Sequence, residues 1–215
     1  IGKSNGEHIS KALKGSMDGL YKRVEMARKN IRSGVDTGLH DLNKITNGWQ
    51  PGNLVIIAAR PSMGKTAVML HLAKSAARSN IPVAIFSLEM SDISLANRLI
   101  LSECNVDPER FKSGYMTNEE INKVETAVNE LWRLPIYVDD NPCVTMDYIR
   151  SRCKILKKQG KCGIIMADYL QLAESGEREG SREREVAKMS RTAKITAKEL
   201  KVPFLLLSQL NRGNE

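Results

Sequence analysis

The chain has 215 residues, of which 41% are hydrophobic and 27% charged, enough apolar material for one large domain or for one domain with an appendage. Its 33 basic and 25 acidic residues give a net charge of +8, which permits a polyanionic partner without requiring one. The sequence has no signal peptide, no long apolar span and no paired spacing among its four cysteines. These features argue against a membrane-spanning protein, a secreted disulfide scaffold or a structural metal site, and we expect a cytoplasmic protein with buried thiols.

The first predicted element is a helix within residues 1–33 that has one narrow apolar stripe and is basic elsewhere. The stripe residues recur every three or four positions: Ile9, Leu13, Met17, Leu20, Val24, Ala27 and Ile31. Eight basic and three acidic residues place +5 of the net charge here, and Gly15 and Gly19 each weaken the helix by about 1 kcal/mol relative to alanine. The stripe could pack on its own domain or on a neighbouring subunit. We favour the neighbour, because such a helix is not stable by itself.

A glycine-containing break at residues 33–38, a short helix near 39–43 and a turn at 48–52 lead to a buried strand at 54–58. The next residues have the layout of a phosphate-binding loop, with Lys65 long enough to reach phosphate oxygens and a helix beginning behind it. Ala59 stands where the usual pattern has its first glycine. The candidate nucleotide-binding residues are Ala59, Arg60, Pro61, Ser62, Met63, Gly64, Lys65 and Thr66.

Further short apolar runs at 83–88, 136–138, 164–167 and 204–207 are mostly continuous, which is typical of strands buried on both faces. Helical patterns separate them, including one that starts at a capping box of Thr117 and Glu120 and one that runs from Val186 to Leu200. This alternation predicts an α/β domain with a mostly parallel sheet and helices on both faces.

Polar side chains follow three of these strands, where ligands bind in such sheets. Glu89, Asp168 and Gln209 would thus face the lysine loop. Phosphate hydrolysis requires a carboxylate that holds Mg²⁺, a carboxylate that polarises water and a group that senses the γ-phosphate. We assign Asp168 with Thr66 to Mg²⁺, Glu89 to water and Gln209 to the phosphate, although each residue alone could merely cap a helix or satisfy a turn.

Four segments in this order resemble the motor domain of the DnaB family of replicative DNA helicases. They read Ala-Ala-Arg-Pro-Ser-Met-Gly-Lys-Thr at 58–66, Phe-Ser-Leu-Glu-Met at 86–90, Asp-Tyr-Leu-Gln-Leu at 168–172 and Ser-Gln-Leu-Asn-Arg at 208–212. Ala59 is what this family itself carries. The resemblance implies a RecA-like P-loop NTPase fold, a homohexameric ring with ATP and Mg²⁺ between subunits, and ATP-driven 5′ to 3′ movement on single-stranded DNA.

The resemblance also implies a division into a linker helix at 1–33 and a RecA-like motor domain at 34–215. The family's primase-interacting domain and its trans-acting arginine would lie outside this sequence, as would contacts with primase and a helicase loader. We therefore read the chain as part of a longer helicase, and expect it to bind Mg²⁺-ATP weakly and hydrolyse it slowly by itself.

The DNA-binding residues are the least defined part of the prediction. Residues 174–185 form a predicted polar loop where the family lines its central pore, with Arg178, Arg182 and Arg184 as candidate DNA contacts. Five glutamates share the segment and no aromatic does, so a solvated loop with local ion pairs is the alternative. Two other functions stay open: a RecA-like recombinase or regulatory ring ATPase without unwinding activity, and a nucleotide-binding assembly module.

Overall fold

A computed structural model describes residues 8–29, 31–141, 144–168 and 179–209, apart from the side chains of residues 179–183 and 185. Its centre is a sheet of five strands in the order β1-β5-β4-β2-β3, and every pairing in the sheet is parallel. The strands are β1 (Leu54–Ala59), β2 (Val83–Ser87), β3 (Ile136–Asp139), β4 (Ile164–Asp168) and β5 (Phe204–Gln209). All five predicted strands are thus present, each with bounds within about two residues of the apolar runs.

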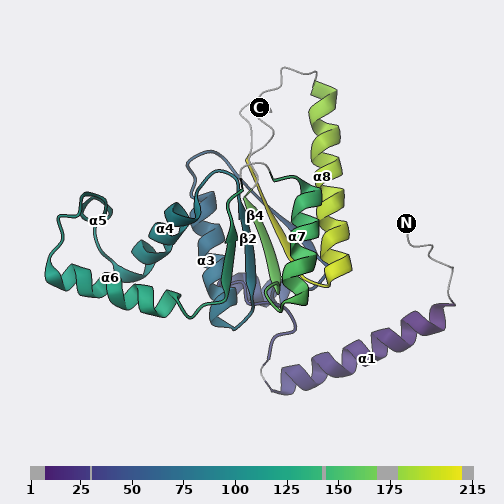
Figure 1. The fold of residues 1–215 in the computed structure, drawn as a ribbon. Coiled ribbons are helices and arrows are strands. Elements are labelled where there is room, and N and C mark those ends of the chain that lie inside the picture. Colours follow the sequence, from purple (N-terminus) through teal and green to yellow (C-terminus); the bar gives the residue numbers. More distant parts are fainter. Residues whose placement is uncertain (1–7, 30, 142–143, 169–178, 210–215) are drawn as a thin grey trace.

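Helices cover both faces of the sheet (Figure 1). They are α1 (Ile9–Arg28), α2 (His40–Thr46), α3 (Lys65–Arg78), α4 (Asp92–Cys104), α5 (Pro108–Ser113), α6 (Asn118–Leu131), α7 (Met146–Lys158) and α8 (Glu179–Leu200). The capping box of Thr117 and Glu120 forms at the start of α6 as predicted. The fold is therefore the expected α/β class.

Each central strand contributes alternate side chains to two separate cores. In β2, Ile85 packs with α3 and α4 on one face, whereas Phe86 packs with α7 and α8 on the other. Every residue of β2 and of β4 is buried. Strands with two buried faces cannot show polar alternation, which is why their sequences are continuous apolar runs.

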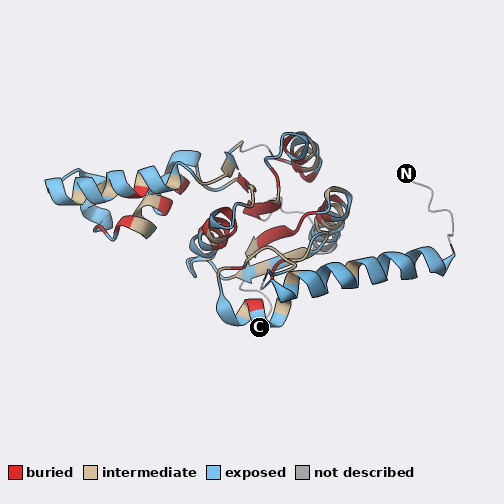
Figure 2. Cartoon of the chain, turned by 90° about the horizontal axis from the view of Figure 1, so that it is seen from below, coloured by how far each residue is buried: buried red, intermediate tan, exposed pale blue. Residues whose placement is uncertain are grey.

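Helix α1 differs from the rest because none of its residues is buried. It extends away from the domain in Figure 1 and is mostly exposed in Figure 2. It ends at Arg28, earlier than the segment predicted from the stripe, and Ile31 beyond it is 52% exposed. The stripe is therefore not covered by the domain of the same chain.

Three helices were not individually predicted, namely α4, α5 and α7. Each begins at a side-chain cap, which Ser91, Asp107 and Thr145 supply in turn. Within the described residues, no helix is both long and apolar enough to span a bilayer. Three of the cysteines, Cys104, Cys153 and Cys162, are buried thiols as expected, and Cys143 lies outside the described residues.

Candidate active site

The lysine loop connects the end of β1 to the start of α3. Gly64 precedes the helix with φ of 82°, and Ser62 also has a positive φ of 62°. A side chain at position 64 would have open space but a strained backbone, so the conformation and not crowding calls for glycine there. No side chain caps α3 and no acidic residue lies in its first turn. The first N–H groups of α3 therefore offer their hydrogen bonds and the positive end of the helix dipole to an anion.

Two side chains from the start of α3 converge on one carboxylate of β4. The Thr66 hydroxyl donates a hydrogen bond to Asp168 Oδ2 at 3.0 Å, and Lys65 Nζ lies 2.8 Å from Asp168 Oδ1. The Lys65 side chain is 9% exposed and that of Asp168 is fully buried. The pair is an ion contact without hydrogen-bond geometry, since neither Nζ nor Oδ1 forms a hydrogen bond with the described residues. Both atoms therefore keep hydrogen-bonding capacity for another ligand.

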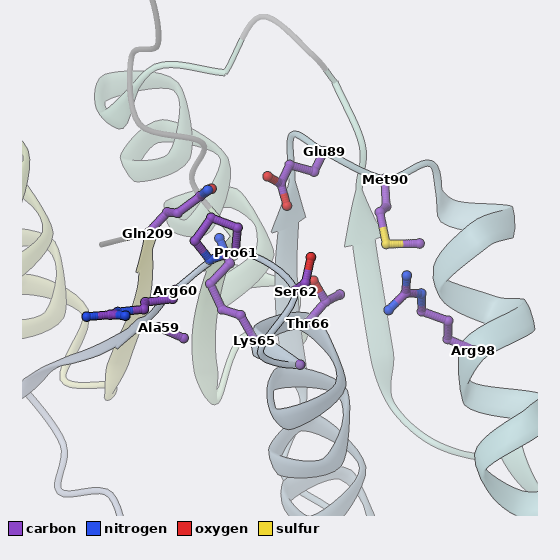
Figure 3. Close-up of a pocket in the computed structure, with 11 residues that line it drawn as sticks. Ala59, Arg60, Pro61, Ser62, Lys65, Thr66, Glu89, Met90, Arg98 and Gln209 are labelled. Carbon is purple, nitrogen blue, oxygen red and sulfur yellow. The ribbon is translucent and has the colours of Figure 1, made fainter. Parts of the chain in front are cut away.

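Strand register places the two other polar residues relative to this carboxylate. Asp168 pairs with Ser87 of β2 on one side and with Leu207 of β5 on the other. Glu89 and Gln209 each lie two residues further along their chains, so they stand on either side of Asp168 and roughly 6–7 Å beyond it. In Figure 3 they point inward from opposite sides of the loop.

These residues border a cavity of about 630 Å³, lined by Ala59, Arg60, Pro61, Ser62, Gly64, Lys65, Thr66, Glu89, Met90, Arg98 and Gln209. Most of the predicted site residues thus meet in one place. Met63 does not line the cavity and is 72% exposed. Asp168 is not a lining residue either, but it is buried in contact with Lys65 and Thr66, which are. In Figure 3 the Arg60 side chain points away from Lys65 on the side of Gln209.

Arg98 is a cavity residue that the sequence prediction missed. It lies on α4 and its guanidinium points toward Met90 in Figure 3. The available signal was the Ser91 cap followed by Leu95 and Leu99, which are the buried residues of a helix that begins just after Glu89. Recognising that helix would have placed α4 just after Glu89, whereas the presence of Arg98 in the cavity depends on how α4 packs.

The prediction of a loop at residues 174–185 is wrong for its second half. Helix α8 begins at Glu179, so residues 179–185 are helical. Glutamate and arginine are good helix formers, and their propensity extends the helix beyond its apolar pattern. Arg184 is exposed on α8, whereas Arg178 and the side chain of Arg182 lie outside what the structure describes.

The donor set fits a magnesium-bound nucleoside triphosphate. Mg²⁺ prefers oxygen ligands, and the Thr66 hydroxyl and the Asp168 carboxylate supply two of them side by side. The uncapped start of α3 and the Lys65 ammonium supply positive charge and donors for phosphate oxygens. Among the described residues no cluster of three or more histidine, cysteine or acidic side chains could hold a metal by itself.

A parallel sheet whose first strand ends in a lysine loop, with a buried carboxylate two strands away beneath it, defines a P-loop nucleotide-binding domain. The family model of the DnaB-like helicase C terminal domain matches residues 34–215. The chain belongs to this family, whose ATPase domains have the RecA fold.

Individual relatives agree with this assignment. The replicative DNA helicase DnaB of Geobacillus stearothermophilus is 40% identical over 209 residues, which are 95% of this chain and 46% of that protein. A solved ATPase domain has a TM-score of 0.84 at 33% identity and covers 97% of this chain and 73% of its own. The structure of a DnaB-like replicative helicase and its interactions with primase has a TM-score of 0.80 at 32% identity, covering 97% of this chain and 49% of its own. The chain thus spans less than half the length of that DnaB protein.

Proposed function

We propose that this chain is the ATP-hydrolysing motor of a replicative DNA helicase that moves 5′ to 3′ on single-stranded DNA as a homohexamer. The observation that carries the proposal is the convergence of Lys65 and Thr66 on the buried Asp168 at the base of the cavity. Family membership favours a helicase over a recombinase or a passive assembly module.

The roles of the site residues follow from their positions. The loop N–H groups and Lys65 would hold the β- and γ-phosphates, while Thr66 and Asp168 would hold Mg²⁺, which neutralises phosphate charge when bound. Glu89 would orient and polarise the attacking water, and Gln209 on the opposite side would sense the γ-phosphate. Arg98 adds a cation to the cavity on the α4 side, where it would stabilise charge that develops during phosphoryl transfer.

The remaining assignments concern parts that act together. Residues 1–33 would be a linker helix and residues 34–215 the motor, which is supported by the exposed stripe of α1. Arg178, Arg182 and Arg184 would contact DNA through phosphates. Primase and a helicase loader would bind through regions that longer relatives possess, because one solved neighbour is described with primase.

The direct test of the site is Lys65→Ala, measured by binding of a fluorescent ATP analogue and by phosphate release. Loss of charge-assisted contacts should weaken ATP binding about ten- to hundredfold. Lys158→Ala, at the exposed end of α7, is the control and should bind normally. Unchanged affinity and turnover in a folded Lys65→Ala variant would contradict the phosphate-loop assignment.

The helicase itself needs two further measurements. Hydrolysis stimulated by oligo-dT separates a motor from an assembly module, and unwinding of a forked substrate by the full-length protein separates a helicase from a recombinase. If the folded protein bound ATP but showed neither DNA-stimulated hydrolysis nor unwinding, only the nucleotide-binding part of the proposal would stand.

A further inference from the structure

One face of helix α8 carries an unbroken row of basic side chains. We call Arg184, Lys188, Arg191, Lys194 and Lys198 the α8 basic row. Their spacing of four, three, three and four residues keeps them on one face over roughly 21 Å of helix. The buried residues Ala193, Thr196 and Ala197 lie on the opposite face, against the sheet. The row therefore faces away from the sheet, with four exposed members and Lys194 half-buried at its edge.

The arrangement costs helix stability. Each neighbouring pair in the row is three or four residues apart, and like charges at that spacing destabilise a helix by about 0.2–0.5 kcal/mol per pair. Some basic residues of other described helices are paired with carboxylates, as in the Lys123–Glu119 contact within α6 and the Arg110–Glu120 contact between α5 and α6. Four successive pairs of like charges give no stability to a helix surface that faces only solvent.

Glu183 and Glu185 flank Arg184 in the sequence, and their side chains lie outside what the structure describes. Beyond them, acidic groups near the row are few. Residues 188–198 contain no carboxylate, and Glu199 just beyond them is engaged by Arg150 and Lys154 of α7. The elements packed on α8 are α7, β1 and β5, and their only acidic residue is Asp147. Within the described residues Arg184, Lys188, Arg191 and Lys198 form no ion pair, and all four are exposed.

The row is also fixed in place. Lys194 donates hydrogen bonds to the Gly52 carbonyl at 2.9 Å and to Asn53 Oδ1 at 3.1 Å, in the turn before β1. From there α8 runs along the sheet toward the end where the candidate site lies (Figure 1). A ligand along the row would therefore extend toward the edge of the sheet that carries Asp168 and Gln209.

We propose that the α8 basic row binds the phosphate backbone of single-stranded DNA without reading its bases. The inference rests on the proposed function for the identity of the polyanion. Regularly spaced phosphates match a straight row of cations, and roughly 21 Å accommodates several of them. Val186 and Ile195 are the large apolar side chains exposed along the described part of α8, too few for the apolar core of a protein interface. Helix α8 has no aromatic residue, so stacking would not add sequence preference.

The test uses the double variant Lys188→Gln with Arg191→Gln and follows anisotropy of labelled oligo-dT over a range of NaCl concentrations. Each phosphate contact on a single strand contributes about 0.7 to the slope of log affinity against log salt, so the slope should fall by about 1.4. Oligo-dA should show the same loss. Lys112→Gln with Arg133→Gln removes the same charges outside the row, at α5 and beyond α6, and should leave the slope unchanged.

Other outcomes would overturn the inference. Equal slopes for wild type and the row variant, or no binding of oligo-dT by wild type, would remove the row as a DNA surface. Greater loss on a duplex of the same length would contradict single-strand binding, and equal weakening of polyglutamate binding would contradict a nucleic-acid surface. Fluorescent ATP binding, measured on the same samples, should be unchanged, so failure of the row is distinguished from failure of the nucleotide site.

Discussion

At the scale of single residues, the site separates the groups proposed to hold a nucleotide from the group proposed to activate water. Lys65 and Thr66 are tied to the buried Asp168, whereas Glu89 is exposed at the rim of the cavity, two residues after the end of β2. Changing Glu89 therefore leaves the phosphate-binding contacts in place. The two functions should be separable by mutation.

We expect Glu89→Gln to bind Mg²⁺-ATP within about twofold of wild type but to hydrolyse it about 10²- to 10⁴-fold more slowly, which is the usual contribution of a general base. Single-turnover phosphate release on the assembled protein measures the effect. Glu130→Gln, near the end of α6 and outside the cavity, is the matched control. Normal hydrolysis by Glu89→Gln would show that another group polarises the water.

The sequence was enough to locate Glu89, Asp168 and Gln209 at one edge of the sheet, because each follows a short apolar run. Asp168 and Gln209 are the last residues of β4 and β5, as that reasoning requires. Arg98 could not be found in this way, because it comes from a helix and its neighbourhood depends on how α4 packs. Contacts that depend on tertiary packing leave no periodic signal in a single sequence.

At the scale of elements, an ion-pair cluster joins the helix of the lysine loop to the helix of Arg98. Lys74 of α3 lies 2.7 Å from Glu103 of α4 and donates a hydrogen bond to the Ser102 hydroxyl at 3.0 Å. Burial alone would raise the pKa of Glu103, but the hydrogen bond and charge of Lys74, with Arg78, outweigh it and lower that pKa below the ordinary 4.5. The cluster thus holds two walls of the cavity together.

Glu103→Ala should lower the free energy of unfolding by about 3 kcal/mol at neutral pH, because it leaves the largely buried Lys74 ammonium without its carboxylate. A carboxylate whose folded pKa is depressed stabilises the fold above its unfolded pKa and loses that contribution as the pH falls through the folded value. The difference from wild type should therefore shrink below pH 4.5.

Urea unfolding at several pH values measures this difference. Glu119→Ala removes an exposed ion pair with Lys123 and serves as the control, with a much smaller loss than Glu103→Ala. A Glu103→Ala effect that stayed constant down to pH 3 would mean that the side chain acts by packing and not by charge.

Helix α1 poses the opposite case, an element with an apolar stripe and no buried residue. We expect Leu20→Asp or Val24→Asp to reduce the oligomeric state measured by light scattering, because a ring repeats one heterologous contact at every subunit boundary. Stability of the motor domain should not change. Lys22→Asp on the basic face alters the charge more and should leave assembly intact, whereas loss of monomer stability in Leu20→Asp would indicate docking within the chain.

At the scale of the whole molecule, the helix boundaries show where sequence reasoning reached its limit. The two cores on either face of the sheet are specified by alternate residues of β2, β4 and β5, so the class of fold followed from the apolar runs. The start of α8 could not be predicted from an apolar pattern, because residues 179–185 are all polar or glycine. Their helical conformation depends on propensity and on continuation from a packed segment.

The contrast between α1 and β4 also implies that parts of one chain open at very different rates. Amide hydrogens of β4, where every residue is buried and both neighbours are strands, should exchange with deuterium only when the whole domain unfolds. Those of α1 should exchange through fraying of a nearly isolated helix that contains two glycines. Because docking would slow only the second process, exchange in α1 should become slower as protein concentration rises, while exchange in β4 stays the same. Deuterium uptake by α1 therefore reports assembly directly. A rate of uptake independent of protein concentration would show that the helix has no partner among copies of this chain.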